Sequence, residues 1–262
     1  MNSLTNNTQR LTEHFQNDRK IIGAYPEDLK VALSSLDTQE ALNEIKSWKG
    51  YKSTQLHSLQ GFAKEIGVQD ILYKDESTRF GLGSFKALGG AYGVLKFIQN
   101  QLTEDLNKNI SIRDIRDGQY LDLTKNYTVV TATDGNHGRS VAYGAKLSGC
   151  KCQIYIHAEV SVGRQHAMEE FGATVIRIKG NYDESLKICI EEATKNNWQI
   201  ISDTSYEGYT RYPRYIMAGY TVLAHEITEQ LDYENIPTHI FLQAGVGGFA
   251  AAIMAYFWEK YP

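Results

Sequence analysis

From residue 127 to the end of the chain, short β-rich runs alternate with longer stretches of helical pattern. The β-rich runs occupy residues 127–132, 152–157, 174–179, 199–203 and 238–243, and the helical patterns occupy residues 138–147, 162–171, 182–196, 215–231 and the stretch that ends at residue 262. This alternation predicts the α/β fold class, with a parallel sheet that is doubly wound by helices. Ligands of such sheets collect at the carboxyl ends of the strands, so polar residues there are the first candidates for a functional site.

The first half of the chain has a less regular pattern. Residues 1–50 are polar and mostly helical in pattern, and a short strand is expected at residues 70–74. A helix is expected to begin close to Lys86, and residues 103–126 are expected to form a loop with short helical pieces.

Composition and charge exclude several classes of protein. With 262 residues, 42% of them hydrophobic, the chain is long enough to bury one large core or two modest ones. The formal net charge is −4 and no long basic stretch occurs, which argues against a nucleic-acid partner. No apolar run approaches transmembrane length, and the polar stretch at residues 1–7 lacks the apolar core of a signal peptide.

The three cysteines, Cys150, Cys152 and Cys189, show no zinc-binding pattern. Cys150 and Cys152 lie where a predicted strand begins, which favours buried or half-buried free thiols. We therefore expect a reduced protein of the cytoplasm that has no metal site.

One lysine has an unusual setting. Lys86 lies among small residues in the stretch GLGSFKALGG at residues 81–90, where a helical pattern begins. The positive end of a helix dipole disfavours a cation at this place, but it suits an amine that must lose its proton or be held in a covalent bond. The alternative is an ordinary solvated surface lysine.

A glycine-rich turn follows the last predicted strand. This segment, Gly245-Val246-Gly247-Gly248, is called the glycine loop below. Glycines allow backbone N–H groups to approach a phosphate closely, and the helix that follows adds its positive end. The alternative is a tight strand-to-helix turn without a ligand.

Two aspartates also lie at the ends of predicted strands. Asp134 follows the strand at residues 127–132, and Asp203 ends the strand at residues 199–203, so both carboxylates should point toward the same cleft. Asp134 has the alternative role of a helix N-cap. His137, in the same turn as Asp134, is either an acid or base or, more often for such a histidine, a structural donor or acceptor.

Four stretches together resemble the fold-type-II pyridoxal-phosphate enzymes, which have the tryptophan synthase β-like fold. They are Ser84-Phe85-Lys86, residues 131–139 (TATDGNHGR), residues 203–209 (DTSYEGY) and the glycine loop with its preceding Gln-Ala. Within this group the pattern is similar to that of the diaminopropionate ammonia-lyases, and the similarity runs along most of the chain. Family members continue past the glycine loop for about another domain's worth of chain, so the fold is expected to be C-terminally incomplete.

The resemblance implies pyridoxal 5'-phosphate as cofactor and assigns residues to it. Lys86 would form the Schiff base, with Phe85 beside it in the family's small-x-Lys signature. Asn136 would lie against the ring hydroxyl, and the glycine loop would hold the phosphate. The residues after Lys86 depart from the Asn or Arg that most relatives carry there, but they are similar to the ammonia-lyase pattern.

The resemblance also implies a reaction. It is the α,β-elimination of 2,3-diaminopropionate, in its D form, its L form or both, to pyruvate and ammonia. Asp134 would handle the α-proton of one enantiomer and Lys86 that of the other, while Asp203 would position the amines. Most relatives carry Ser or Thr at the position of Asp134, and a carboxylate there suits a second ammonium group rather than a substrate carboxylate.

The family's architecture further suggests how the chain is divided. Residues 1–90 and 235–262 are expected to belong to a large cofactor-binding domain, and residues 91–234 to a smaller α/β domain. A homodimer is expected by analogy, with a small amino acid as substrate and no nucleic-acid or membrane partner.

Two other functions stay open at this point. A serine or threonine dehydratase would use the same cofactor, although Asp134 argues against it. An inactive remnant with a binding role fits the incomplete fold, although the presence of Lys86, Asp134 and Asp203 argues against it. A nucleotide-binding Rossmann protein is disfavoured because the turn after residues 127–132 lacks the G-x-G-x-x-G pattern.

Overall fold

The structure is a computed structural model that describes residues 15–232 and 236–262. The polar stretch at residues 1–7 and the expected domain boundary at residue 235 lie outside the described residues. None of the described helices is long and apolar enough to cross a membrane.

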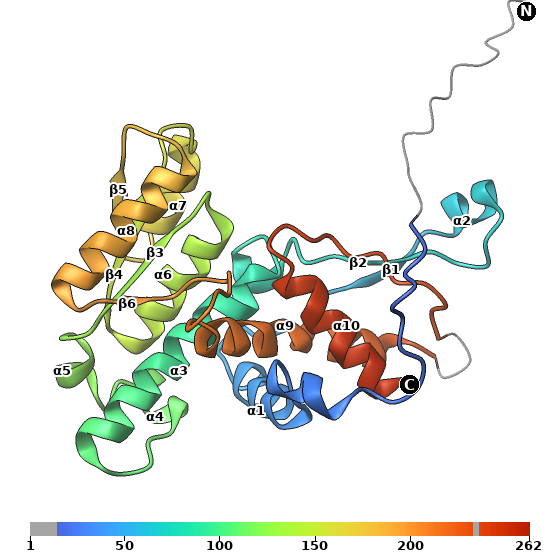
Figure 1. Cartoon of the computed structure of the whole chain (residues 1–262), viewed down its shortest axis with the longest axis horizontal. Coiled ribbons are helices and arrows are strands. Elements are labelled where there is room, and N and C mark those ends of the chain that lie inside the picture. Colours follow the sequence, from blue (N-terminus) through green and yellow to red (C-terminus); the bar gives the residue numbers. More distant parts are fainter. Residues whose placement is uncertain (1–14, 233–235) are drawn as a thin grey trace, which may run out of the picture.

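A parallel sheet of four strands lies in the part of the chain where strands and helices were predicted to alternate (Figure 1). Its strands are β3 (Thr128–Ala132), β4 (Lys151–Ile156), β5 (Thr174–Arg177) and β6 (Gln199–Ile200), in the order β5-β4-β3-β6. The predicted α/β fold with a parallel sheet is confirmed. Because β6 joins the opposite side of β3, the strand order reverses between β3 and β6, which leaves a crevice at their carboxyl ends.

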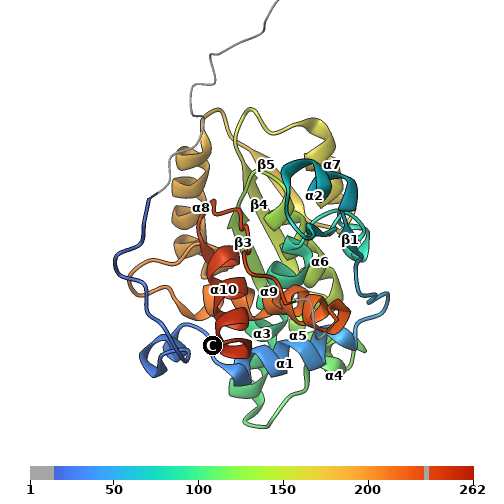
Figure 2. The same ribbon diagram turned by 90° about the vertical axis from the view of Figure 1, so that its right-hand side faces the viewer.

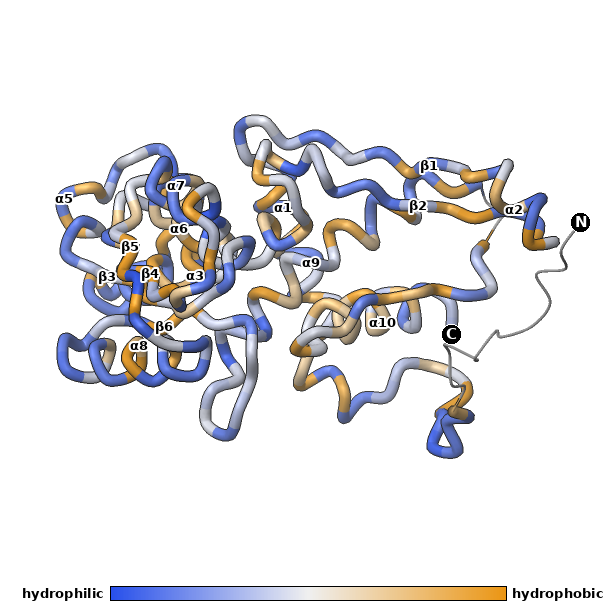
Figure 3. The backbone as a smooth tube through the Cα atoms, turned by 90° about the horizontal axis from the view of Figure 1, so that it is seen from above, coloured by the Kyte–Doolittle hydropathy of each residue, from blue (hydrophilic) through white to orange (hydrophobic). Residues whose placement is uncertain are grey.

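Helices cover both faces of this sheet. Helices α6 (Asn136–Ser148) and α7 (Val162–Glu169) lie on one side of it and α8 (Tyr182–Asn196) on the other (Figure 3). Successive strand residues point to opposite faces, so Val129 packs in the main core with Val141 of α6. Its neighbour Val130 packs in a second core with Cys189 and Ala193 of α8. Burial on both faces explains the apolar strand sequences.

The remaining elements gather around the long helix α3 (Lys86–Leu106) and around α9 (Arg211–Gln230). Helix α9 packs against α3, α1 (Ser35–Lys46) and α10 (Gly248–Lys260) (Figure 2). Strands β1 (Leu56–Ser58) and β2 (Leu72–Lys74) form an antiparallel pair, and the chain between them contains α2 (Gln60–Ile66). Short pieces complete the chain, namely the 3-10 helices Glu27–Val31 and Arg79–Gly81 and the helices α4 (Ile112–Arg116) and α5 (Leu121–Thr124).

The predicted strand at residues 238–243 is wrong. Among the described residues this segment pairs with neither the antiparallel pair nor the four-stranded sheet, and Phe241 is 94% exposed. A strand requires a neighbour for its backbone N–H and C=O groups, and no described strand lies beside this segment. The β-rich composition is present, but this segment is not paired with any strand of the described residues.

A buried ionic cluster joins the segment before Lys86 to α9. Arg79 and Glu226 are 1% and 0% exposed, and the guanidinium donates to both carboxylate oxygens of Glu226 at 2.7 Å. Arg79 also binds Glu76 at 2.7 and 2.8 Å, while Lys74 approaches Glu226 to 2.8 Å. The hydroxyl of Tyr51 donates to Glu226 at 2.9 Å. This cluster fixes the approach of the chain to Lys86.

Glycines allow α3 to lie directly against α9. A Cβ atom added to Gly219 would lie 2.5 Å from the carbonyl oxygen of Leu88 and 2.9 Å from the Cα of Gly89. Both are backbone atoms of α3, so a larger residue would push the two helices apart. The close approach therefore holds the first turn of α3, which carries Lys86, in place.

The substitution Gly219→Ala tests this contact. We expect a loss of about 1–3 kcal/mol in the free energy of unfolding, measured by urea denaturation, because the added methyl group must displace backbone. The control is Gly61→Ala in α2, where a Cβ would meet no atom within 4 Å. That variant should be unchanged or more stable by up to about 1 kcal/mol. Equal effects of the two substitutions would contradict the packing argument.

Candidate active site

Lys86 is the first residue of α3, and its side chain is half-buried rather than solvated. Its Nζ contacts Oδ2 of Asp203, and the side chains of Lys86 and Asp203 are 27% and 16% exposed. Asp203 follows β6, so the contact joins segments 117 residues apart in sequence. The carboxylate compensates for the unfavourable position of a cation at a helix N-terminus.

Asp203 is held by side chains rather than by the sheet, because β6 pairs over two residues only. The hydroxyl of Tyr209 accepts a hydrogen bond from the N–H of Ser202 and donates one to the carbonyl of Ile200, both at 2.9 Å. Burial alone would raise the pKa of Asp203, but the positive charge of Lys86, which contacts the carboxylate, contributes to a net lowering of that pKa. Asp203 is therefore an ionised group beside the Lys86 amine.

Removal of the Tyr209 hydroxyl tests its role as an anchor. In Tyr209→Phe the N–H of Ser202 and the carbonyl of Ile200 lose their partner, so we expect a loss of about 1–3 kcal/mol in the free energy of unfolding. The control is Tyr206→Phe, since Tyr206 is 52% exposed and stacks on Tyr209 with ring centroids 4.9 Å apart. A Tyr209→Phe variant as stable as this control would show that the hydroxyl is dispensable.

Asp134 follows β3, at the expected end of the strand, but it is not the helix N-cap. The N-cap residue is Gly135, and the hydroxyl of Thr133 accepts hydrogen bonds from the N–H groups of Gly135 and Gly138 at 3.1 and 3.2 Å. The Asp134 side chain is 65% exposed and lies 3.1 Å from Nε2 of His157. Within the described residues it makes no hydrogen bond to Lys86 or Asp203, so the two carboxylates have different partners.

Tyr182, at the start of α8, lies near both carboxylates. Its pKa is raised, first by burial and then by the negative charges of Asp203 and Asp134. Asp134 and Asp203 follow β3 and β6, which are neighbours in the sheet, so both lie at its carboxyl edge.

The glycine loop lies against Asp203. A Cβ added to Gly248 would be 3.5 Å from the carbonyl oxygen of Asp203, whereas Gly245 and Gly247 face open space. Gly247 has a φ of 87°, which favours glycine, and it is the N-cap of α10. Phe249, the second residue of α10, packs on Phe85 with ring centroids 4.1 Å apart. The loop, the Lys86 segment and Asp203 therefore meet at one place.

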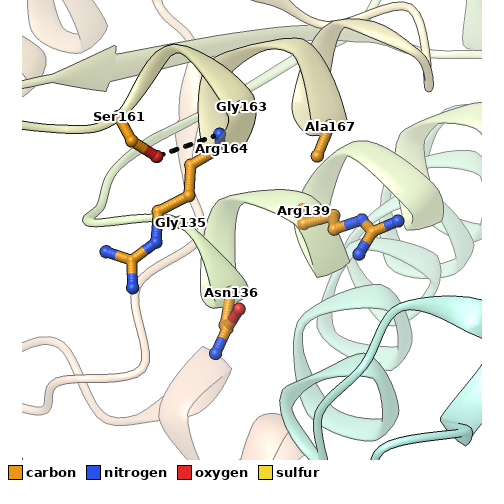
Figure 4. Close-up of a pocket in the computed structure, with 7 residues that line it drawn as sticks. All are labelled: Gly135, Asn136, Arg139, Ser161, Gly163, Arg164 and Ala167. Carbon is orange, nitrogen blue, oxygen red and sulfur yellow. Dashed lines mark hydrogen bonds between the residues drawn. The ribbon is translucent and has the colours of Figure 1, made fainter.

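Asn136 lines a cavity of about 260 Å³ beside these residues (Figure 4). The N-termini of α6 and α7 meet there, and Ser161 caps α7 by accepting from the N–H of Arg164 at 3.3 Å. The Arg164 guanidinium donates to the carbonyl of Asp134 at 3.2 Å. The walls are formed by Gly135, Asn136, Arg139, Ser161, Gly163, Arg164 and Ala167. The guanidinium of Arg139 donates instead to the carbonyls of Leu82 and Gly81, at 3.0 and 3.3 Å. The two helix N-termini favour an anion in this cavity.

These residues fit a cofactor with an aldehyde and a phosphate. Lys86 offers an amine with a carboxylate partner, and the open glycine loop at the start of the 13-residue helix α10 offers free N–H groups. Across residues 15–232 and 236–262 no group of three or more potential metal ligands occurs. The arrangement suits proton transfer at an amino acid held by a covalently bound cofactor.

Sequence reasoning missed three residues of this region, His157, Tyr182 and Arg164. His157 ends the predicted strand at residues 152–157, so its place at the carboxyl edge of the sheet was a usable signal. Tyr182 and Arg164 lie in the first turns of helices, where no sequence pattern singles them out.

Comparison with known proteins agrees with this arrangement. Residues 48–262 match the protein family described as pyridoxal-phosphate dependent enzyme. The diaminopropionate ammonia-lyase of Salmonella typhimurium is 40% identical to this chain over 223 residues, which cover 84% of this chain and 55% of that protein. The diaminopropionate ammonia-lyase of Escherichia coli K12 is 38% identical over 213 residues, which cover 81% and 52%.

A solved structure has the same fold. Diaminopropionate ammonia-lyase from Escherichia coli in complex with D-serine superposes with a TM-score of 0.80 at 35% identity, covering 88% of this chain and 58% of that one. The chain thus spans about half the length of the known relatives it matches. The family match extends over most of the chain, and it includes Lys86, Asp203 and the glycine loop. The chain therefore belongs to the pyridoxal-phosphate dependent enzymes and has their type II fold.

Proposed function

We propose that this chain is a pyridoxal-phosphate dependent ammonia-lyase that converts 2,3-diaminopropionate to pyruvate and ammonia by α,β-elimination. The observation that carries the proposal is the contact between Lys86 and Asp203 beside the glycine loop. The similarity to the diaminopropionate ammonia-lyases of Salmonella typhimurium and Escherichia coli supports the choice of substrate.

Four parts of the chain would hold the cofactor. When bound, pyridoxal 5'-phosphate supplies an aldehyde for the amine and a ring that stabilises negative charge at the substrate α-carbon. Lys86 would provide the amine, the glycine loop would hold the phosphate through its N–H groups, and Asn136 would hold the ring. Phe85, packed on Phe249, supports the loop from the side of α3.

The two carboxylates and Lys86 would act on the substrate. Asp203 pairs with one substrate ammonium group, and Asp134 removes the α-proton of one enantiomer, while Lys86 removes that of the other. The exposure of Asp134 leaves it accessible to a small amino acid. The cavity near Asn136 and Arg164 suits the substrate carboxylate, because helix N-termini favour an anion.

The proposal also covers the domain division of the chain, its oligomeric state and its compartment. We propose that residues 1–90 and 235–262 belong to a large cofactor-binding domain and residues 91–234 to a smaller domain, which the placement of the four-stranded sheet supports. Helix α9 packs on elements of both parts, so the boundary is a packed one. We further propose a homodimer in the cytoplasm, and the three free cysteines suit a reducing compartment.

A substrate panel tests the reaction. Release of 2-oxo acid and ammonia is measured with D- and L-2,3-diaminopropionate, serine and threonine, using protein supplied with the cofactor. We expect pyruvate from diaminopropionate at the highest kcat/KM. Turnover of serine or threonine alone would assign a dehydratase, and cofactor binding without any turnover would assign the inactive binding protein.

Substitution of Asp134 tests the division of labour between the two enantiomers. We expect Asp134→Asn to lower kcat/KM for one enantiomer by about 10²–10⁴-fold, the usual contribution of a positioned general base, and to leave the other within a few fold. The control is Asp122→Asn, since Asp122 is 96% exposed in α5. Equal loss for both enantiomers would show that Asp134 binds substrate rather than removing one α-proton.

A further inference from the structure

The buried histidine next to Asn136 has a defined orientation. His137 is 5% exposed, and its Nε2 lies 2.9 Å from the carbonyl oxygen of Ile201. A carbonyl oxygen only accepts hydrogen bonds, so Nε2 carries the hydrogen. In the neutral imidazole, Nδ1 therefore has a lone pair and no hydrogen.

The Nδ1 atom of His137 faces the Lys86–Asp203 pair. It is buried, has no hydrogen-bond partner among the described residues and lies 3.8 Å from Oδ2 of Asp203. The same oxygen atom contacts Nζ of Lys86. A buried polar atom without a hydrogen-bond partner requires an explanation in a folded protein. Here the atom is Nδ1 of His137, and the oxygen nearest to it, Oδ2 of Asp203, already pairs with the Lys86 ammonium.

We propose that His137 is a positioning residue that takes a proton on Nδ1 whenever Lys86 no longer offers an ammonium group to Asp203. While Lys86 is charged, its ammonium group pairs with Oδ2 of Asp203, and Nδ1 of His137 carries a lone pair and no hydrogen. When Lys86 loses that charge, the carboxylate of Asp203 faces a buried space without a cation. A proton on Nδ1 then places a positive charge 3.8 Å from Oδ2, which favours the ionised form of Asp203.

The charge balance of this exchange is simple. One proton leaves Nζ of Lys86 and one proton arrives at Nδ1 of His137, either through Oδ2 or from water, and no electrons are transferred. Asp203 carries its negative charge before and after, and the cluster keeps one positive charge. The hydrogen on Nε2 stays there throughout and is donated to the carbonyl oxygen of Ile201.

The groups that act on this exchange are few. Asp203, from the segment after β6, faces Nδ1, and Lys86, from α3, faces the same carboxylate. Tyr182, from α8, lies within electrostatic reach of Asp203, and its neutral phenol adds no charge. Asp134, on the same turn as His137, is directed to His157.

The inference rests on the proposed function for one point only, namely that Lys86 gives up its ammonium group during the reaction. Its test therefore uses the protein without cofactor and without turnover. Long-range 1H–15N correlation spectra of the His137 ring distinguish a nitrogen that carries a hydrogen from one with a lone pair. Spectra are recorded at pH 7 for the wild type, Lys86→Met and the double variant Lys86→Met/Asp203→Asn.

We expect the Nδ1 signal at the lone-pair position in the wild type, at the N–H position in Lys86→Met and again at the lone-pair position in the double variant. An Nδ1 signal that stays at the lone-pair position in Lys86→Met would overturn the proposal. Lys86→Gln serves as a second uncharged variant if Lys86→Met does not give a folded spectrum. These outcomes do not depend on whether the chain turns over diaminopropionate. Failure of the proposed function can therefore be distinguished from failure of the proposal for His137.

His137→Gln separates the two nitrogens. Glutamine can still donate to the carbonyl of Ile201 but offers no titrating group to Asp203. We expect the urea stability of this variant to lie close to that of the wild type. The loss of stability caused by Lys86→Met should instead be larger in the His137→Gln background. In that background Asp203 is left without the Lys86 ammonium and without a protonated imidazole. Equal effects of Lys86→Met in the two backgrounds would contradict the proposal.

Discussion

Replacement of Lys86 by alanine is expected to abolish release of pyruvate from 2,3-diaminopropionate. The substitution removes the amine that would hold the cofactor and one of the proposed bases, and loss of a positioned base alone lowers rates by about 10²–10⁴-fold. It also leaves Asp203 without the cation that contacts its carboxylate. The measurement is kcat/KM for both enantiomers, with cofactor in excess.

Lys187→Ala is the matched control for this substitution. The Lys187 side chain is 78% exposed and lies 4.0 Å from Glu191 on the surface of α8. We expect its kcat/KM to equal that of the wild type, since exposed ion pairs contribute little. A Lys86→Ala enzyme that retained turnover similar to the control would contradict the assignment of Lys86.

The second large effect is expected for Glu226→Gln in the buried ionic cluster. The variant leaves Arg79 and Lys74 buried with one carboxylate fewer, and breaking a buried ion pair in this way costs about 3–5 kcal/mol. We therefore expect a loss of this size in the free energy of unfolding from urea denaturation at pH 7. The control is Glu229→Gln, since Glu229 is 52% exposed and its ion pair with Lys46 lies at the surface.

The pH dependence of this effect follows from the pKa of Glu226. Burial alone would raise it, but the hydrogen bonds and charges of Arg79 and Lys74 lower the pKa from 4.5 to about 2. Because the pKa is lower in the folded state, the ionised carboxylate stabilises the fold by about 3 kcal/mol at any pH above the pKa of the unfolded chain. This stabilisation is lost as the pH falls from about 4.5 toward 2.

The stability difference between wild type and Glu226→Gln should therefore be largest at neutral pH. It should shrink as the pH falls from about 4.5 toward 2, because the amide of the variant does not titrate whereas the carboxylate of the wild type does. A difference that stays constant over this range would mean that the loss comes from packing and not from the ionised carboxylate.

The fold was predictable where burial determines the sequence. Strands β3 and β4 are covered on both faces, so β3 is apolar or β-branched throughout and β4 ends in the apolar run Ile154-Tyr155-Ile156. The helices of this half likewise begin at capping residues that the sequence displays, such as Ser161 before α7 and Asn181 before α8. Local chemistry and tertiary burial agree here, and the prediction succeeded.

Pairing and long-range contacts were less predictable. Residues 238–243 have a strand composition, but whether such a segment forms a strand depends on a neighbour that its own sequence does not specify. Strand β6 pairs with β3 over two residues only, and the Tyr209 hydroxyl, which follows it in the chain, donates to the carbonyl of Ile200. The structure brought Asp203 to Lys86, whereas the sequence only placed it at the end of a strand.

Asp134 illustrates the limit of motif reasoning. Its position after β3 was predicted, but the sequence did not show that Gly135 would be the N-cap of α6 or that His157 would be the partner of Asp134. The contact with His157 depends on how the end of β4 lies beside the end of β3, which is a property of the sheet.

The most direct test of the central claim is the visible absorption spectrum of the purified chain during titration with pyridoxal 5'-phosphate. We predict a saturable band from cofactor bound covalently to Lys86, which changes on addition of 2,3-diaminopropionate and is absent from Lys86→Ala. Borohydride reduction and peptide mapping would then locate the cofactor on Lys86. A spectrum that shows only free cofactor, or an identical band in Lys86→Ala, would contradict the account.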